Sequence, residues 1–173
     1  RAFGRENKIP ILLDDTLEYI SNILNDIKPY RILEVGTAIG YSALCFSKYL
    51  SEGGRIDTIE IESLRVEQAL ENIEKVGAMD KIRVLEGDAL DILPYLTEEY
   101  DVVFIDAAKA QSVKFFTKYE PLLKKGKYII TDNLSFHGLV DSNEEMSRNL
   151  KQLVRKIKNY ISFLKDNENY DTT

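Results

Sequence analysis

The sequence is poor in the residues that mark several classes of protein. Among its 173 residues there is one cysteine, Cys45, which excludes a disulfide framework and agrees with a reducing, cytoplasmic location. No apolar run approaches the length of a membrane span, and the first residues do not resemble a signal peptide. Low-complexity tracts are also lacking. These absences favour an ordinary globular protein of the cytoplasm, long enough for one domain with a proper core.

An excess of positive charge is lacking as well. The 23 Lys and Arg residues against 29 Asp and Glu residues give a net charge of -6, which argues against indiscriminate binding of nucleic acid. This sum leaves room for a local basic face, because the distribution of charge matters more than the total. Methionine is missing from the start, where Arg1 stands, and this predicts a trimmed or partial chain.

The sequence does contain a strict alternation of short apolar strands and amphipathic helices. The strand-like stretches are RILEVG, RIDTIEI, KIRVLEGD, YDVVFID and KKGKYIITDN. Helices are expected over 14–28, 41–50, 63–76, 90–96, 112–123 and 143–164, the first with Asp14 or Asp15 as its N-cap. The alternation predicts an α/β fold, a doubly wound and mostly parallel sheet with helices on both faces. Right-handed crossovers then place the carboxyl ends of the strands at one edge, where ligands of such folds bind.

The first strand ends in a glycine loop, EVGTAIGYS. Gly36 and Gly40 allow a tight turn and a close approach of a ligand, and the amides that open the next helix can hold an anion together with Ser42. The spacing G-x-x-x-G differs from the G-x-G-x-x-G of dinucleotide-binding proteins, and it fits a ligand with a carboxylate in place of a pyrophosphate. A glycine turn that serves packing alone is the alternative.

Acidic residues end the next two strands. Glu60 lies about twenty residues past the loop, the expected place of an acid that binds two ribose hydroxyls. The third strand ends in Gly87, Asp88 and Ala89, where an acid and backbone groups can contact an adenine edge. A plain N-cap role for Asp88 is almost as well supported. Together with the glycine loop, these strand ends predict a nucleoside pocket.

The fourth and fifth strands end in a different set of side chains. Asp106 and Lys109 follow the fourth strand, and Asp132 and Asn133 follow the fifth. Two carboxylates and an amide oxygen at neighbouring strand ends are hard ligands of the kind that Mg²⁺ prefers. The alternatives are a salt bridge between Asp106 and Lys109, and a turn formed by Asp132 and Asn133.

Five motifs in this order resemble the Mg²⁺-dependent S-adenosylmethionine O-methyltransferases, the family of catechol and caffeoyl-CoA O-methyltransferases. They are ILEVGTAIGYSAL, IDTIEIE, VLEGDALDILP, YDVVFIDAAK and YIITDN, and FIDAAK followed by TDN is the specific part. The resemblance runs from about residue 10 to the end of the chain. It implies a Rossmann-like class I methyltransferase fold, one catalytic domain over 1–173, a homodimer, and S-adenosylmethionine and Mg²⁺ as cofactors. The family usually continues past a point like NYDTT into an antiparallel hairpin, which this sequence does not include.

The resemblance also implies roles for single residues. Asp106, Asp132 and Asn133 would be the metal ligands and Lys109 the general base. Glu60 would bind the ribose, and Leu12 would close over the cofactor, unless it only forms a hydrophobic staple. The whole cofactor-binding set is Leu12, Glu34, Gly36, Thr37, Gly40, Ser42, Glu60, Gly87, Asp88, Ala89 and Asp106.

The acceptor is the less determined part of the resemblance. Ala107 and Ala108 stand where catechol enzymes have bulky residues, which implies a more open entrance to the substrate site. In this respect the sequence most resembles the tRNA wobble 5-hydroxyuridine O-methyltransferases. A small catechol-like or phenolic acceptor is the alternative. Two basic clusters could suit tRNA: Lys124, Lys125 and Lys127, then Arg148, Lys151, Arg155, Lys156 and Lys158. The second cluster could equally be a solvated helix face balanced by Glu144 and Glu145.

Two further residues and two rival functions complete the predictions. His137, next to Phe136, could line the substrate mouth but is a weaker base candidate than Lys109, and Cys45 is most simply a core residue. An NAD-dependent oxidoreductase would need the closer glycine spacing, and a non-catalytic RNA-binding module would tolerate loss of the acids that end strands four and five.

Overall fold

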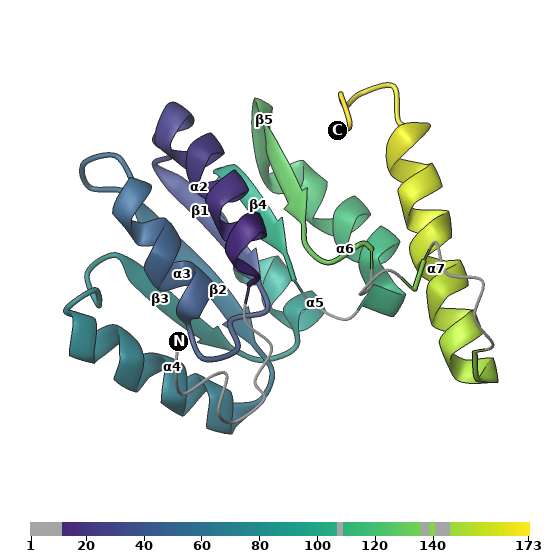
Figure 1. Ribbon diagram of the computed structural model, residues 1–173. Helices are drawn as coiled ribbons and strands as arrows, with labels where there is room; N and C mark the ends of the chain where they lie inside the picture. Colours follow the sequence, from purple (N-terminus) through teal and green to yellow (C-terminus); the bar gives the residue numbers. More distant parts are fainter. Residues whose placement is uncertain (1–11, 107–108, 136–138, 141–145) are drawn as a thin grey trace.

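The computed structural model describes residues 12–106, 109–135, 139–140 and 146–173, with Lys109 described for its backbone alone (Figure 1). Its strands are β1 (Arg31–Val35), β2 (Arg55–Glu60), β3 (Ile82–Glu86), β4 (Tyr100–Ile105) and β5 (Leu123–Thr131). Its α-helices are α2 (Asp14–Ile27), α3 (Tyr41–Phe46), α4 (Ser63–Val76), α5 (Ala89–Ile92), α6 (Ser112–Tyr119) and α7 (Arg148–Lys165). Short 3-10 helices are η1 (Ser47–Tyr49), η2 (Leu93–Tyr95), η3 (Lys109–Gln111) and η4 (Glu120–Leu122).

The five strands form one sheet in the order β3-β2-β1-β4-β5, and all four neighbouring pairs are parallel. This confirms the predicted Rossmann-like α/β fold. The chain builds outward from β1 to β3, then returns to the other side of β1 for β4 and β5. The direction of winding therefore changes between β1 and β4, and the carboxyl ends of these strands are where a ligand is expected.

The helix boundaries follow the prediction closely, except that α2 has a different N-cap and that α7 begins at Arg148, after the expected residue 143. The N-cap of α2 is Leu13, whose backbone is extended and whose carbonyl accepts from the Leu17 N–H at 2.9 Å. The predicted N-cap residues, Asp14 and Asp15, lie instead in the first turn, where their charges still favour the positive end of the helix dipole. Helix α7 begins after Ser147, which caps it; residues 143–145 of the helix expected there lie outside the described residues.

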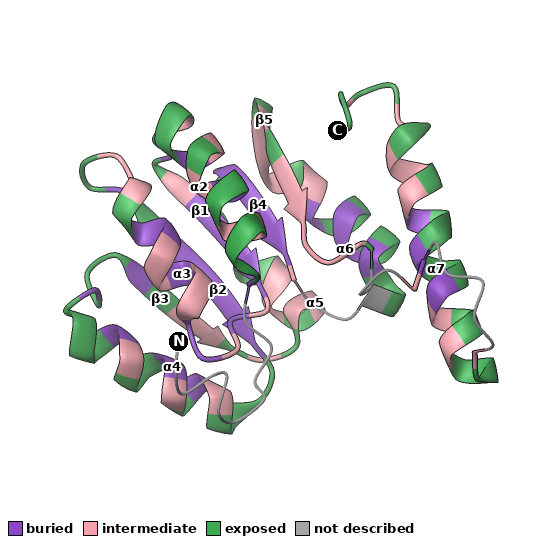
Figure 2. Cartoon of the chain, viewed as in Figure 1, coloured by how far each residue is buried: buried purple, intermediate pink, exposed green. Residues whose placement is uncertain are grey.

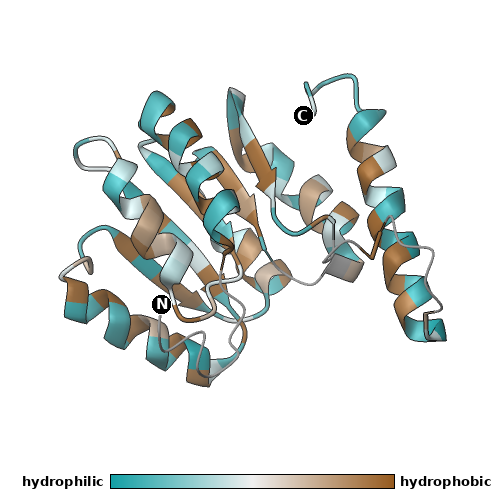
Figure 3. Ribbon diagram, viewed as in Figure 1, coloured by the Kyte–Doolittle hydropathy of each residue, from teal (hydrophilic) through white to brown (hydrophobic). Residues whose placement is uncertain are grey.

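Both faces of the sheet are covered, and the strands carry the core between them (Figures 2 and 3). On β4, Val102 and Phe104 pack with α2, α3 and α4, whereas Val103 and Ile105 pack with α5 and α6. This alternation is the period of two that a strand buried on both faces requires. Cys45 is partly buried against the first of these clusters, as expected for a core residue.

Helix α7 lies beyond α6 at the β5 side of the molecule (Figure 1). Phe116 of α6 makes edge-to-face contacts with Tyr160 and Phe163 of α7, at centroid distances of 6.4 and 5.3 Å. The Tyr160 hydroxyl also lies 2.8 Å from the Thr131 hydroxyl, at the carboxyl end of β5. None of the helices in the described part of the chain is both long and apolar enough to cross a bilayer.

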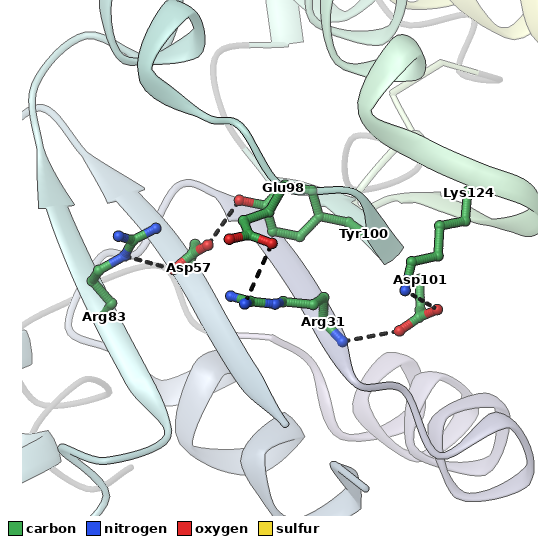
Figure 4. A network of polar contacts seen from close by, with 7 residues as sticks. All are labelled: Arg31, Asp57, Arg83, Glu98, Tyr100, Asp101 and Lys124. Atoms are coloured by element: carbon green, nitrogen blue, oxygen red, sulfur yellow. Dashed lines mark hydrogen bonds and ion pairs between the residues drawn. The ribbon is translucent and has the colours of Figure 1, made fainter. Parts of the chain in front are cut away.

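The amino edge of the sheet is closed by ion pairs and hydrogen bonds (Figure 4). Buried Asp57 of β2 accepts from Arg83 Nε and from the Tyr100 hydroxyl, both at 2.7 Å. Asp101 of β4 accepts from two backbone N–H groups at the start of β1 and from Lys124 of β5 at 3.2 Å. Burial by itself would raise the pKa of the Asp101 carboxyl, but these hydrogen bonds together lower that pKa below its ordinary value.

Candidate active site

The glycine loop between β1 and α3 has an unusual backbone. Gly36, Ala38 and Gly40 have φ values of 108°, 46° and 78°, a backbone region that residues other than glycine rarely adopt. The Gly36 and Thr37 N–H groups both donate to the Ile59 carbonyl, at 3.0 and 3.1 Å. A Cβ at Gly40 would also contact Ala69 of α4 at 3.4 Å. The loop is therefore a tight turn held against the end of β2, as the spacing of the glycines predicts.

Glu60 lies beside this loop at the carboxyl end of β2. Its carboxylate accepts from the Ala38 N–H at 2.8 Å and from the Ile61 and Glu62 N–H groups at 3.0 and 3.1 Å. The side chain is only 6% exposed, so these hydrogen bonds determine where its oxygens point. A carboxylate has about four lone-pair sites, and the three contacts leave capacity for a hydroxyl donor. This arrangement suits the predicted ribose contact.

Glu34 of β1 lies under the loop and is fully buried. It accepts from the hydroxyls of Ser42 and Thr58, one at each carboxylate oxygen. Burial raises the pKa of the Glu34 carboxyl from 4.5 to about 7; the two hydroxyl donors lower it, and the charges of Asp106 and Glu60 raise it further. Glu34 and Ser42, both predicted cofactor residues, are thus directly linked.

The end of β3 carries the predicted adenine contacts. Gly87 has a φ of 145°, and its N–H donates to the Glu60 carbonyl at 2.8 Å, so this turn is tied to the end of β2. Asp88 is the N-cap of α5 and accepts from the Leu90 N–H at 2.8 Å. The Ala89 carbonyl accepts from the Tyr119 hydroxyl of α6. Asp88 therefore has the capping role considered as its alternative, and the adenine contact stays a prediction.

The predicted metal ligands lie at the ends of β4 and β5. The Asp106 N–H donates to the Val35 carbonyl at 2.9 Å, and the Asp132 N–H donates to the Ile105 carbonyl at 3.2 Å. These bonds continue the strand pairing, so Asp106 and Asp132 follow neighbouring strands that are about 4.8 Å apart. Asn133 has a left-handed backbone with a φ of 59°. The described residues include no cluster of three or more Asp, Glu, His or Cys side chains, and the predicted set has two carboxylates and one amide.

Several predicted site residues lie in the core or outside the residues that the structure describes. Leu12 is buried in the core cluster that Leu17 also contacts, which agrees with a staple, and its contact with the cofactor is untested. The side chain of Lys109 lies outside the described part, and so do Ala107, Ala108, Phe136, His137, Glu144 and Glu145. The Lys109 backbone opens η3, which follows Asp106 at the same edge of the sheet.

The two basic clusters lie in different places. Lys124 and Lys127 are near the amino end of β5, at 3.2 and 3.8 Å from Asp101, on the edge opposite the glycine loop. The residues of the second cluster are exposed on α7, and three of them line a hollow of about 390 Å³: Arg148, Lys151 and Arg155. Helix α7, which carries the second cluster, contacts η3, the 3-10 helix that follows β4.

Sequence reasoning missed two residues of this edge. Thr58 of β2 is fully buried, and its hydroxyl lies 2.6 Å from that of Thr37. Its place opposite Glu34 in the register of the sheet, between Asp57 and Glu60 of a buried strand, was known only from the structure. Ile61 is 64% exposed although it follows Glu60 directly. Its exposure could not be read from the sequence.

Comparison with known proteins places these features in a family. A family model described as O-methyltransferase matches residues 8–166. A catechol O-methyltransferase from Niastella koreensis is 35% identical over 114 residues, which are 64% of this chain and 52% of that enzyme. The chain thus spans about half the length of this curated relative.

Solved structures extend the similarity to the whole chain. A Staphylococcus aureus protein provisionally named a caffeoyl-CoA O-methyltransferase matches with a TM-score of 0.94 and 38% identity, over 100% of this chain and 83% of its own. The O-methyltransferase TomG from Streptomyces achromogenes, solved in complex with SAM, matches with a TM-score of 0.81 and 27% identity, over 95% and 75%. With its sheet order, its glycine loop and a family match over residues 8–166, this chain belongs to the O-methyltransferase family.

Proposed function

We propose that this chain transfers a methyl group from S-adenosylmethionine to an ionisable ring hydroxyl, with Mg²⁺ as the metal. The observation that carries the proposal is the placement of two different sets of side chains along one edge of the sheet. The glycine loop and Glu60 follow β1 and β2, and Asp106 and Asp132 follow β4 and β5. Such an edge can bind a nucleoside on one side and an acceptor on the other, with the reacting groups between them.

The cofactor half of the site fits S-adenosylmethionine. Glu60 would accept from a ribose hydroxyl, because its three backbone donors hold the carboxylate in place and leave one of its about four lone-pair sites. The glycine loop would admit the methionine end close to the backbone, where Ser42 supplies a hydroxyl. The SAM complex of TomG, which shares this fold, supports the assignment.

The donor set at the ends of β4 and β5 fits a divalent cation. Asp106 and Asp132 supply two carboxylates from neighbouring strands, and Asn133 supplies an amide oxygen next to the second. Hard oxygen donors with few protein ligands suit Mg²⁺, which keeps part of its water shell. When bound there, the metal would lower the pKa of an acceptor hydroxyl and orient it.

Lys109 is the proposed general base. It stands three residues after Asp106 in the sequence and opens η3, which contacts α7. Its neutral amine would take the proton of the acceptor hydroxyl as the oxygen forms a bond to the methyl carbon and the carbon–sulfur bond breaks. The products are a methyl ether and S-adenosylhomocysteine. General base catalysis of this kind contributes about 10²–10⁴-fold to a rate.

A small catechol-like or phenolic acceptor is the first candidate. It agrees with the names of the relatives, a catechol O-methyltransferase and a caffeoyl-CoA O-methyltransferase. The position of Lys124 and Lys127 also favours it, because these residues pair with Asp101 at the opposite edge of the sheet. tRNA carrying 5-hydroxyuridine is the second candidate, and its support in the structure is the exposed basic side of α7 near η3.

A methylation assay tests the proposal. The purified chain is incubated with methyl-labelled S-adenosylmethionine and one of three acceptors: a simple catechol, tRNA with 5-hydroxyuridine, or unmodified tRNA. We expect transfer to the catechol that Mg²⁺ supports and that chelation by EDTA abolishes. Lys109→Met should lower this rate about 10²-fold. Transfer to modified tRNA alone would replace the first acceptor by the second, and transfer that is insensitive to both EDTA and Lys109→Met would refute the mechanism.

The homodimer predicted from the family resemblance is part of the same proposal. Light scattering on the purified chain at several concentrations measures its mass directly. A mass near twice the 19.9 kDa of the chain is expected, and a constant mass of one chain would contradict it.

A further inference from the structure

Four polar side chains under the glycine loop form one continuous line of hydrogen bonds. Ser42 and Thr58 each donate to one oxygen of Glu34, and the hydroxyls of Thr58 and Thr37 are 2.6 Å apart. Because the single hydroxyl hydrogen of Thr58 points to Glu34, Thr37 must donate to Thr58 when Glu34 is ionised. Glu34 and Thr58 are fully buried and Thr37 is 1% exposed, so water does not readily replace these bonds.

These hydrogen bonds connect both ends of the glycine loop to β2, a strand that does not adjoin the loop in the sequence. Glu34 of β1 stands directly opposite Thr58 of β2 in the register of the sheet. Thr37 lies at the beginning of the loop, and Ser42 lies in the first turn of α3 at its end. Thr58 therefore reaches the start of the loop directly, and it reaches the end of the loop through Glu34.

Three consecutive residues of β2 hold this loop in different ways. Thr58 contributes its hydroxyl, Ile59 accepts two N–H groups with its carbonyl, and Glu60 accepts the Ala38 N–H with its carboxylate. The loop needs such restraint, because Ala38 has a positive φ, which is unfavourable for a residue with a Cβ. The hydroxyl of Thr58 is the only one of these three contacts that a nearly isosteric substitution can remove.

We propose that Thr58 is a positioning residue of the cofactor site, which holds the glycine loop in its binding geometry by linking Thr37 to Glu34. The inference rests on the proposed function, since the loop is taken to bind S-adenosylmethionine. Thr58 lies beneath the loop and acts through Thr37 and Glu34. Its hydroxyl matters for the binding of the cofactor, and the acceptor half of the site does not depend on it.

The experiment compares Thr58→Val, which removes the hydroxyl at nearly constant volume, with Thr58→Ser, which keeps it. Binding of S-adenosylhomocysteine is measured by calorimetry, and initial rates give kcat and both KM values. Thr58→Val should raise the Kd about tenfold, the effect of one or two lost buried hydrogen bonds. It should raise KM for S-adenosylmethionine more than it changes kcat or KM for the acceptor. Thr58→Ser should restore the Kd to within about twofold.

Tyr100→Phe is the matched control, because it also removes a buried hydroxyl that is bonded to a carboxylate, Asp57. It lies at the opposite edge of the sheet and should leave the Kd unchanged. If Thr58→Val folds poorly, Thr58→Ala provides the same comparison with room for a water molecule. Wild-type affinity in the folded Val or Ala variant would overturn the inference, as would a Ser variant that binds no better than Val.

The control and the wild-type chain each have an outcome that bears on the proposal. An equal loss of affinity in Tyr100→Phe would show that binding follows general stability, and this would also overturn the role of Thr58. A folded wild-type chain that does not bind S-adenosylhomocysteine would overturn the proposed function together with this inference. Wild-type binding that Thr58→Val leaves unchanged removes the inference alone.

Discussion

The carboxylates at the two edges of the sheet, the amino ends and the carboxyl ends of its strands, have different hydrogen-bond partners. At the amino edge, Asp57 pairs with Arg83, and Asp101 pairs with Lys124 (Figure 4). At the carboxyl edge, Glu34 accepts from two hydroxyls, and Glu60 accepts from three backbone N–H groups. Cations neutralise the first group of acids, whereas neutral donors orient the second group without cancelling its charge. The comparison teaches that ion pairs hold the acids of one edge, whereas the proposed ligand site lies at the edge where neutral donors hold Glu34 and Glu60.

The arrangement at the carboxyl edge has an electrostatic cost, which is visible in the raised pKa of Glu34. The charges of Asp106 and Glu60 add to the effect of burial and keep the pKa of Glu34 high. Acids gathered at one edge repel one another, and a bound cation or a set of hydroxyl donors would relieve that repulsion. Four substitutions, two at each edge of the sheet, can break or sharpen this comparison.

The largest effect is expected for Asp132→Asn at the carboxyl edge. Replacing one charged carboxylate of the proposed metal site by a neutral amide should lower the rate of Mg²⁺-supported methyl transfer about 10³-fold, which corresponds to about 4 kcal/mol of activation free energy. Steady-state kinetics with a catechol over a range of Mg²⁺ concentrations measure it. Asp101→Asn at the amino edge is the control, and it should lower stability with little change in kcat. Equal rate losses in both variants would contradict the division between the edges.

The second effect concerns Glu34 and pH. Because the folded state raises the pKa of Glu34 from 4.5 to about 7, the folded protein binds more protons than the unfolded chain between these values. The contribution of Glu34 to the free energy of unfolding should therefore fall by about 3 kcal/mol as the pH rises through this window. Glu34→Gln removes this dependence.

Urea denaturation of both proteins from pH 4.5 to 8, without ligands, gives the difference directly. We expect Glu34→Gln to gain stability relative to wild type as the pH rises. A difference that is constant over the window would contradict the raised pKa. Tyr100→Phe is a suitable reference, because burial raises the pKa of Tyr100 away from this window and its effect should not change there.

The third effect is the stability loss in Tyr100→Phe itself. The substitution leaves Asp57 without the 2.7 Å hydrogen bond from the phenol, while Arg83 still donates to the other oxygen. The free energy of unfolding should fall by about 1–2 kcal/mol at pH 7. Thermal or urea denaturation measures it. A loss of methyl transfer in the folded variant would show that the amino edge also serves catalysis.

The smallest effect is expected for Lys124→Met. Lys124 is 35% exposed and makes one of several contacts to Asp101, so the loss of stability should be about 0.5 kcal/mol at pH 7 and less in high salt. The hydrogen bonds to Asp101 lower its pKa, so its contribution is present above the ordinary value of 3.8 and is lost as the pH falls below it. The difference in the free energy of unfolding between wild type and Lys124→Met should shrink over the same pH range. A loss above 2 kcal/mol would assign the ion pair a larger role than its exposure allows.

Local patterns predicted most of this fold. The alternation of Val102, Val103, Phe104 and Ile105 between the two faces follows from the apolar run alone, and Gly77 ends α4 where it was expected. The N-cap of α2 was mispredicted, because Asp14 and Asp15 are both good capping residues. Leu13 has an extended backbone but makes no side-chain capping hydrogen bond, so the preference of residue types for caps did not decide this position.

The candidate site was predicted in its parts but not in its connections. Glu34, Ser42 and Glu60 were each named from the sequence, and the role of Thr58 was missed. Glu34 and Thr58 are 24 residues apart in the chain and meet because β1 and β2 pair in one register. Asp106 and Asp132 come together in the same way through the pairing of β4 and β5.

The sequence by itself determined which residue types end each strand, the alternation of strands with helices, and therefore the class of fold. Only the tertiary structure decided which acids pair with cations and which accept hydrogen bonds from neutral donors. Charge pairing depends on which strand ends become neighbours, as when Lys124 of β5 reaches Asp101 of β4. Parallel pairing joins residues that are 23 positions apart at Asp101 and Lys124 and 24 positions apart at Glu34 and Thr58, so residues distant in the sequence form ion pairs at one edge and hydroxyl-bonded acids at the other.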